Sequence, residues 1–259
     1  MSTLSDTTTW LPLDGLAPGF DANKAPVTGD LDGRAFDLHD DAHDADGHTI
    51  TFTGTTVTWN GTATPAETFL VDDDLYYVQL HPAAREAVSL LLDLRNGRAL
   101  VITTTIGDHG TPRVTQQFRP ATLAGTETHG EPMAPTTALI GRRVLWTYSR
   151  EHAYEHVYLS PHWYTWQCLA GPERGLADTD ENTVSQIRPG IHVFAWREKV
   201  IPCASVTVAD HRNARHLRSH GVLFGLDGTG QHPTHFTFGA HGRLLSTTVH
   251  PAGLDPAED

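Results

Sequence analysis

Length, composition and charge limit the classes of protein to which this chain can belong. Its 259 residues suffice for one large or two small domains with a sizeable core. Lysine and arginine number 18 against 31 aspartates and glutamates, so the formal net charge of −13 repels nucleic acid. No stretch approaches the roughly 20 apolar residues of a membrane span, and residues 1–10 lack the features of a signal peptide. We therefore expect a cytoplasmic protein with neither nucleic-acid nor membrane partners.

Strand-like patterns fill the first half of the chain after a loop-like lead-in. Prolines and glycines recur through residues 1–28, which is typical of loops, whereas Trp10 and Phe20 predict that this lead-in packs onto the rest of the protein. Asp46-Gly47 and Asn96-Gly97 indicate hairpin turns. Alternating apolar and polar residues predict about eight strands, at 34–39, 48–54, 56–59, 67–71, 75–80, 87–94, 98–106 and 113–118.

The second half of the chain repeats the first. Residues 119–138 are rich in Ala, Thr, Gly and Pro, as expected of a linker. After this linker four segments return in the same order: Leu31–Arg34 as Leu139–Arg142, Thr58-Trp59 as Thr165-Trp166, Asp74–Val78 as Gly190–Phe194, and Asp93–Gly97 as Asp210–Ala214. Four matches in one order indicate an internal duplication.

Each copy has the size of a small closed antiparallel barrel, a fold that leaves no sheet edge free and can hold one small ligand. We therefore predict an all-β protein with two tandem antiparallel β-barrel repeats, over residues 29–118 and 139–250, followed by a tail over 251–259. The pattern leaves open whether the barrels are separate or packed face to face, and it is compatible with a homodimer.

Aromatic and ionisable residues concentrate in the second repeat. Residues 141–178 and 194–199 hold four tryptophans and four tyrosines together with several arginines, glutamates and histidines. In a small barrel one face of each strand points inward, and burying a charge is costly unless it is paired. A functional site is the best reason for such a cost. The first repeat is thus expected to be structural and the second to carry the site.

Glu198 is the leading candidate for acid–base chemistry. Period-2 alternation places it on one face with Trp196 and Val200, and an inward position would raise its pKa towards neutrality, as a general acid needs. The alternative is an outward Glu198 paired with Arg197 or Lys199. Because Arg197 and Glu198 alternate, only one of them should face the cavity.

Tyr148 and Arg174 are the other candidate catalytic residues. Tyr148 could donate a hydrogen bond to a developing oxyanion, although a tyrosine in the barrel wall would serve packing alone. Arg174 lies in a Gly-Pro-Glu-Arg-Gly turn and could bind a substrate carboxylate or phenolate through two hydrogen bonds. A structural pair with Glu173 or Asp178 is the alternative.

Metal and cofactor motifs are missing from the sequence. His152 and His156 would be a ligand pair on a helix, but on a strand they only share a face, so we consider them as acid–base partners. Residues 37–48 lack the carboxylate spacing of a calcium loop and predict a solvated hairpin. Cys168 and Cys203 are expected to be free buried thiols, with a nucleophilic Cys168 as the alternative. Without a glycine-rich phosphate loop or a CxxC motif, we expect no metal and no cofactor.

The chain resembles a known family over nearly its whole length. The residues that carry this resemblance are 148–159 (YSREHAYEHVYL), 164–180, 194–199 (FAWREK), 220–225 (HGVLFG) and 238–245 (FGAHGRLL). They resemble the molybdenum cofactor biosynthesis protein F (MoaF) family, which has two parts. The family name hints at a small ligand such as a pterin.

The second repeat is more distantly similar to phenolic acid decarboxylases, which are lipocalin-like (calycin-like) barrels that act without a cofactor. Residues 146–148 and 152–155 match two of that family's strands, 170–174 its Ala-Gly-Arg turn, and 196–198 the stretch with its catalytic acid. The resemblance implies Tyr148, Arg174 and Glu198 as site positions. Trp146 replaces the first tyrosine of the family's carboxylate clamp, and Arg197 precedes the acid.

Three functions are compatible with these features. One is a cofactor-independent lyase or isomerase that acts on an aromatic or polyketide-like molecule in the second barrel. Another is a binding protein for a pterin or other small ligand, and the third is an interaction protein with an empty barrel. Ionisable residues at inward positions favour the enzyme. Further substrate-binding candidates are Trp146, Tyr154, His156, Trp166, Trp196, Arg197 and His152.

Overall fold

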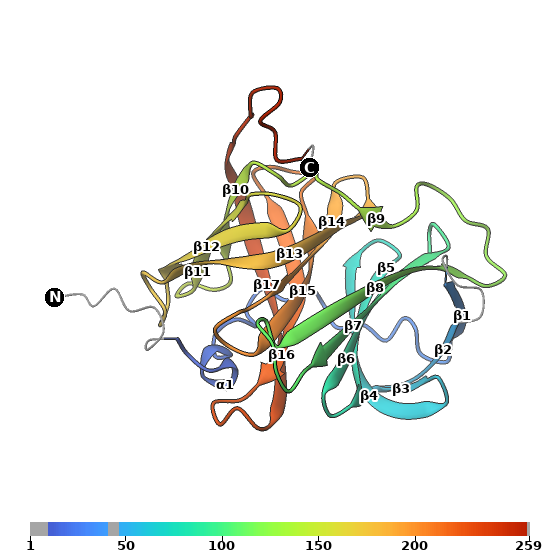
Figure 1. Ribbon diagram of the computed structural model, residues 1–259. Coiled ribbons are helices and arrows are strands. Elements are labelled where there is room, and N and C mark those ends of the chain that lie inside the picture. The colour runs from blue at the N-terminus through green and yellow to red at the C-terminus, as the bar shows by residue number, and fades with distance from the viewer. Residues whose placement is uncertain (1–9, 41–46, 258–259) are drawn as a thin grey trace. The chain divides into compact units, whose positions relative to one another are not determined.

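The computed structural model describes residues 10–40 and 47–257, which divide into two compact units. One unit consists of residues 25–107 and 115–134. The other consists of the residues up to Lys24 together with 108–114 and 135–259. Among the described residues α1 (Leu13–Leu16) is the one helix, and strands form the rest of the regular structure (Figure 1). The predicted all-β class with two tandem antiparallel barrels is thereby confirmed.

The first barrel is an up-and-down meander of eight strands. They are β1 (Ala35–Asp40), β2 (His48–Thr53), β3 (Thr56–Trp59), β4 (Thr62–Asp72), β5 (Leu75–Ala83), β6 (Glu86–Asp93), β7 (Arg98–Ile106) and β8 (Val114–Leu123). Consecutive strands are neighbours, and antiparallel pairing of β1 with β8 closes the ring. Buried apolar side chains such as Leu38, Trp59 and Leu90 pack its interior, as expected for the structural copy.

The second barrel has the same eight-stranded order. Its strands are β10 (Arg142–Thr147), β11 (Ala153–Tyr158), β12 (Trp163–Ala170), β13 (Ala177–Arg188), β14 (Ile191–Arg197), β15 (Cys203–Asp210), β16 (Leu217–Leu226) and β17 (Pro233–Thr247). Pairing of β10 with β17 and of β12 with β13 completes the ring, and the short β9 (Ala134–Pro135) extends the sheet beside β13.

The duplicated segments occupy equivalent places in the two barrels. Gly33 and Gly141 both have a positive φ, 74° and 82°, in the turn before the first strand. Asp74 and Gly190 both have a positive φ, 57° and 77°, in the turn between the fourth and fifth strands. Left-handed backbone of this kind favours glycine or aspartate. The sequence repeat therefore preserves the turns that set the strand register.

The strand ends differ from the expected repeat boundaries. β8 continues to Leu123, beyond the expected end of the first repeat at residue 118, because Ala121 and Leu123 still point into the apolar core. The second barrel ends with β17 at Thr247. Of the acidic stretch at 37–48, residues 41–46 lie outside the described residues, and so does Asp46 of one predicted turn.

Residues 10–24 of the lead-in pack against the second barrel, although the first barrel follows them in sequence, whereas Pro26, Val27 and Thr28 pair with β4 of the first barrel. The Asn23 side-chain amide donates hydrogen bonds to the carbonyl oxygens of Thr147 (3.2 Å) and Tyr148 (2.9 Å). Asp14 accepts one from the Gly228 backbone N–H at 2.9 Å. Residues 10–24 therefore belong to the unit whose barrel is built from the C-terminal half of the chain.

A glycine in β17 makes this docking close. A Cβ atom added at Gly239 would overlap the carbonyl oxygen of Asn23, so Gly239→Ala must displace the lead-in or the strand. We expect the free energy of unfolding of this variant to be about 1–3 kcal/mol lower than that of wild type. Urea unfolding followed by tryptophan fluorescence measures this. Gly29→Ala is the matched control because its Cβ meets no atom within 4 Å, and an equal loss in both variants would contradict the account.

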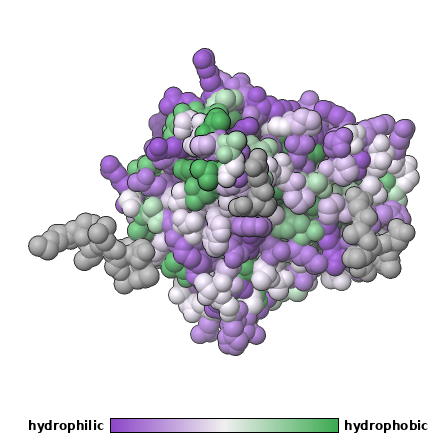
Figure 2. Space-filling view, turned by 45° about the horizontal axis from the view of Figure 1, so that its top comes forward, coloured by the Kyte–Doolittle hydropathy of each residue, from purple (hydrophilic) through white to green (hydrophobic). Residues whose placement is uncertain are grey.

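One face of the molecule is mostly hydrophilic or of intermediate hydropathy. Purple and white residues cover most of the face shown in Figure 2, and green ones form small patches. Exposed large apolar residues, including Val27 and Val249, are scattered along the chain. Among the described residues, we find no helix that is long and apolar enough to cross a membrane.

Candidate functional site

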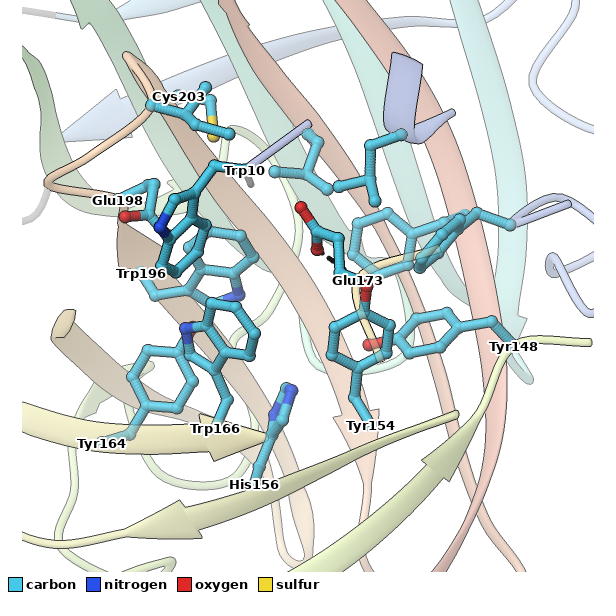
Figure 3. A pocket seen from close by; sticks show the side chains of 15 residues that line it. Trp10, Tyr148, Tyr154, His156, Tyr164, Trp166, Glu173, Trp196, Glu198 and Cys203 are labelled. Atoms are coloured by element: carbon cyan, nitrogen blue, oxygen red, sulfur yellow. Dashed lines mark hydrogen bonds between the residues drawn. The ribbon is translucent and has the colours of Figure 1, made fainter. Parts of the chain in front are cut away.

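The interior of the second barrel contains a cavity of about 70 Å³ with a largely aromatic wall (Figure 3). A cavity of this volume could hold a few water molecules. The lining residues are Trp10, Leu16, Phe20, Tyr148, Tyr154, His156, Tyr164, Trp166, Glu173, Trp196, Glu198, Ile201, Cys203, Leu223 and Phe238. Neither lysine nor arginine occurs in this set of described residues.

The lead-in supplies part of the cavity wall. Trp10, Leu16 and Phe20 line it together with barrel residues. The Trp10 ring meets the edge of Trp166 at a centroid separation of 5.2 Å, and Phe20 lies 4.8 Å from Tyr148. The sequence predicted that the lead-in packs onto the body, but it did not indicate a contribution to the site.

Glu198 lies at the cavity wall directly after β14 and is 4% exposed. Its Oε1 accepts a hydrogen bond from the backbone N–H of Val200 at 2.9 Å. Burial, followed by the nearby charge of Asp180, raises the pKa of Glu198 to about 8. The side chain is therefore mostly protonated at neutral pH, the state in which a carboxyl group donates a proton.

The predicted face of Trp196, Glu198 and Val200 is correct for two of its three members. Trp196 and Glu198 line the cavity, whereas Val200 is exposed and offers only its backbone. Strand β14 ends at Arg197, so period-2 alternation stops before Val200. Arg197 points the other way and pairs with Glu181, with 3.4 Å between Nε and Oε2.

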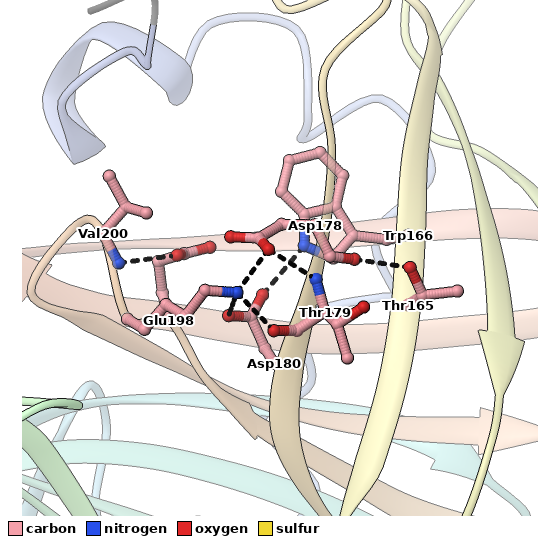
Figure 4. A network of polar contacts seen from close by, with 8 residues as sticks. Thr165, Trp166, Asp178, Thr179, Asp180, Glu198 and Val200 are labelled. Carbon is pink, nitrogen blue, oxygen red and sulfur yellow. Dashed lines mark hydrogen bonds and ion pairs between the residues drawn. The ribbon is translucent and has the colours of Figure 1, made fainter. Parts of the chain in front are cut away.

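Glu198 belongs to a group of three carboxyl groups (Figure 4). Single carboxylate oxygens of Asp178, Asp180 and Glu198 lie within 4.8 Å of one another. Asp180 is fully buried and accepts a hydrogen bond from the Trp166 indole N–H at 2.9 Å. Burial raises the pKa of Asp180 as well. Two buried acids side by side cannot both ionise easily, so one of them retains a proton.

Lys199 supplies a positive charge beside these three carboxyl groups. Lys199 Nζ hydrogen-bonds Asp178 and lies 3.9 Å from Asp180. Among the described residues, these three carboxyl groups are the set that lies close enough together to hold a metal ion. The Lys199 ammonium group already supplies a positive charge beside two of them. The donor set therefore gives no reason to place a metal ion here.

Glu173 is a second carboxyl group at the wall, and the sequence pattern missed it as a site residue. Its Oε2 accepts a hydrogen bond from the Tyr154 hydroxyl at 3.0 Å, and its Oε1 accepts one from the Leu11 backbone N–H at 3.2 Å. Burial raises the pKa of Glu173. Glu173 thus joins the lead-in to the barrel wall.

Tyr148 and His156 line the cavity, as do Tyr154, Trp166 and Trp196. Burial raises the pKa of the Tyr148 phenol, so it keeps its proton and can donate a hydrogen bond. Burial lowers the pKa of His156 to about 3, so its imidazole is neutral. Its buried Nδ1 has no hydrogen-bond partner among the described residues.

Four predicted site residues lie elsewhere. Trp146 is buried in the core, with its ring 5.8 Å from His211. His152 contacts the Ser149 hydroxyl through Nδ1 at 3.0 Å and packs against Phe20. Arg174 is exposed at its turn, and Arg197 pairs with Glu181. None of the four lines the cavity. Arg174 and Arg197 point away from the barrel interior, whereas Trp146 and His152 are buried against other rings.

Cys168 and Cys203 are free and buried, as expected. Burial raises the pKa of both thiols, which disfavours the thiolate that a nucleophile requires. Cys203 contributes its sulfur to the cavity wall, although the sequence pattern did not single it out.

Comparison with known proteins assigns both halves of the chain to one family. The model for the MoaF N-terminal domain matches residues 8–108, and that for the MoaF C-terminal domain matches residues 133–248. The chain belongs to the MoaF family. A MoaF relative, Protein MoaF of Klebsiella aerogenes, is 29% identical over 211 residues, which are 75% of this chain and 79% of the relative.

One solved structure is also similar. It is a crystal structure from Burkholderia vietnamiensis that carries a β-lactamase name. The match has 13% identity and a TM-score of 0.33, and it covers 41% of this chain and 95% of that protein. At this TM-score the similarity supports no argument about the MoaF fold or function.

Proposed function

We propose that this MoaF protein is a small-molecule enzyme of the lyase or isomerase type that uses Glu198 as its proton-transfer residue. The observation that carries the proposal is a buried carboxyl group at the wall of an aromatic cavity, with a pKa raised to about 8. A group whose pKa lies near the working pH is an effective general acid or base. Burying such a group at a cavity wall is costly unless the protein uses it.

The chemistry of the cavity wall favours an uncharged aromatic substrate, although the cavity of about 70 Å³ would have to widen to admit one. Aromatic rings form most of its wall, and two carboxyl groups, Glu173 and Glu198, supply its acidic chemistry. Since the lining residues include no cation, an anionic substrate would find no charged partner there. This disfavours the decarboxylation of an aromatic acid, the reaction of the family that the second repeat distantly resembles. Arg174, which that resemblance implied as a site residue, lies outside the cavity.

The proton-transfer step follows from the neighbours of Glu198. Protonated Glu198 would donate to a substrate oxygen or carbon and become a carboxylate next to Asp180. Repulsion between the two negative charges would then favour the return of a proton to Glu198. The neutral Tyr148 phenol would donate a hydrogen bond to the substrate oxygen that gains negative charge.

A reaction-class assay tests this proposal without a known substrate. Uncharged aromatic ketones with enolisable C–H bonds are incubated with the protein in D₂O, and deuterium incorporation is followed by proton NMR. We expect at least one compound to exchange, and Glu198→Gln to slow that exchange on the order of 10²-fold or more. Glu131→Gln is the matched control, because Glu131 is exposed and outside the cavity. Wild-type exchange in the Glu198 variant would refute the role of Glu198.

Ligand binding without catalysis is the second candidate function. An aromatic wall would also suit a carrier of a pterin or similar heteroaromatic molecule, in line with the family name. Intact-protein mass spectrometry of the purified protein would then reveal an unchanged ligand. In a carrier Glu198→Gln should keep most of the affinity, whereas in an enzyme the variant should bind the substrate and fail to convert it.

A further inference from the structure

A second concave site lies on the outer face of the second barrel, over β10, β16 and β17. It encloses about 580 Å³, a volume typical of small-molecule sites. Its lining residues are Leu145, Thr147, Arg215, His216, Leu217, Arg218, His241, Gly242 and Arg243. We call it the arginine groove. It shares no lining residue with the cavity that contains Glu198.

The strand register explains how the charged side chains come together. Arg218 of β16 lies opposite His241 of β17, and Arg243 of β17 lies opposite Leu145 of β10. Directly opposed residues have side chains on the same face of a sheet. Arg215 joins them from the loop that precedes β16. Three guanidinium groups thus surround one groove.

These arginines lack the acidic partners that other exposed arginines have. Arg143 pairs with Glu155 and Arg212 with Asp210. By contrast, Arg215, Arg218 and Arg243 are exposed, and their guanidinium groups make neither an ion pair nor a hydrogen bond with any described residue. Aspartate and glutamate are missing from the described lining of the groove. The chain as a whole carries a net charge of −13, so this concentration of unpaired positive charge is local.

We propose that the arginine groove binds a small phosphorylated molecule. Guanidinium groups bind phosphate through paired hydrogen bonds. Three of them can balance a ligand that carries more than one negative charge. The half-buried side chain of Leu145 offers apolar surface to the organic part of the ligand. A long nucleic acid is disfavoured because the net charge of −13 would repel its backbone. The ligand class is thus a phosphate ester of small-molecule size.

Inorganic pyrophosphate is the probe that tests this proposal. Isothermal titration calorimetry at low, fixed ionic strength should show one binding site on the full-length protein. Arg218→Ala and Arg243→Ala should each weaken binding at least tenfold, because each removes a charge-assisted hydrogen-bond donor. Arg218→Lys should weaken it less, since the charge remains while the paired geometry is lost.

Arg150→Ala is the matched control. Arg150 is exposed and makes no interaction with a described residue, and its removal changes the net charge by the same amount. It should leave pyrophosphate binding unchanged. The proposal is overturned if wild type does not bind pyrophosphate at millimolar concentration, or if Arg150→Ala weakens binding as much as the groove variants do. Thermal unfolding of each variant verifies that the barrel is intact.

Discussion

Glu198→Gln is expected to raise the free energy of unfolding at pH 7 by about 2–3 kcal/mol. The ordinary pKa of the carboxyl is 4.5, and in the folded protein it is raised to about 8. Between these pH values the unfolded chain releases a proton that the folded chain keeps, so wild-type stability falls as pH rises. Glutamine has the shape of the protonated acid but cannot release a proton, so the variant avoids this loss.

Urea unfolding at pH 5, 7 and 8 measures this effect through tryptophan fluorescence. The difference between Glu198→Gln and wild type should be below about 1 kcal/mol at pH 5 and grow towards pH 8. Glu131→Gln controls for the loss of a carboxyl at an exposed position and should leave the free energy of unfolding close to that of wild type at each pH. Parallel curves for wild type and the Glu198 variant would show that the carboxyl is not protonated in the folded state.

Phe20→Ala is expected to detach the lead-in from the cavity and to destabilise the second barrel by about 3 kcal/mol. Phe20 is 4% exposed, and its ring contacts Tyr148, His152 and Tyr154 with centroid separations of 4.8, 4.8 and 5.9 Å. Its removal takes away a large buried side chain and one wall of the cavity. The uncharged dye Nile red should then bind more tightly, because the aromatic cavity becomes accessible.

Phe36→Ala is the control for this prediction. Phe36 is half-buried and packs against the core of the first barrel, so its loss should leave Nile red binding to the second barrel unchanged. Dye affinity and unfolding are measured on both variants by fluorescence. If Phe20→Ala keeps wild-type stability and dye affinity, the lead-in does not close the cavity.

The fold could be predicted from the sequence because its determinants are local. Alternation of apolar and polar residues defines strands, and positions such as Asp74 and Gly190 define turns with positive φ. Both signals appear twice in the same order, which is why two barrels could be expected. The unit to which the lead-in belongs was not predictable, because the Leu11–Glu173 contact joins residues far apart in sequence.

The residues of the candidate site could be predicted from the sequence only where strand alternation determines which side chains point into the barrel. Tyr148, Tyr154 and Trp196 occupy inward positions that alternation defines. Asp180 was missed because its neighbourhood resembles a solvated acidic strand. The pairing of Glu181 with Arg197 across β13 and β14 brings it beside Glu198. Arg174 was assigned to the site through a family motif, yet its turn leaves the side chain exposed.

The protonation state of Glu198 is the central claim, and carbon-13 NMR measures it directly. Protein with ¹³C-labelled glutamate is titrated from pH 4 to pH 10, and the Glu198 carboxyl signal is assigned by its absence in Glu198→Gln. We expect a midpoint near pH 8 for this signal. A Glu198 midpoint below pH 5 would show an ionised carboxylate at neutral pH and would contradict its role as a proton donor.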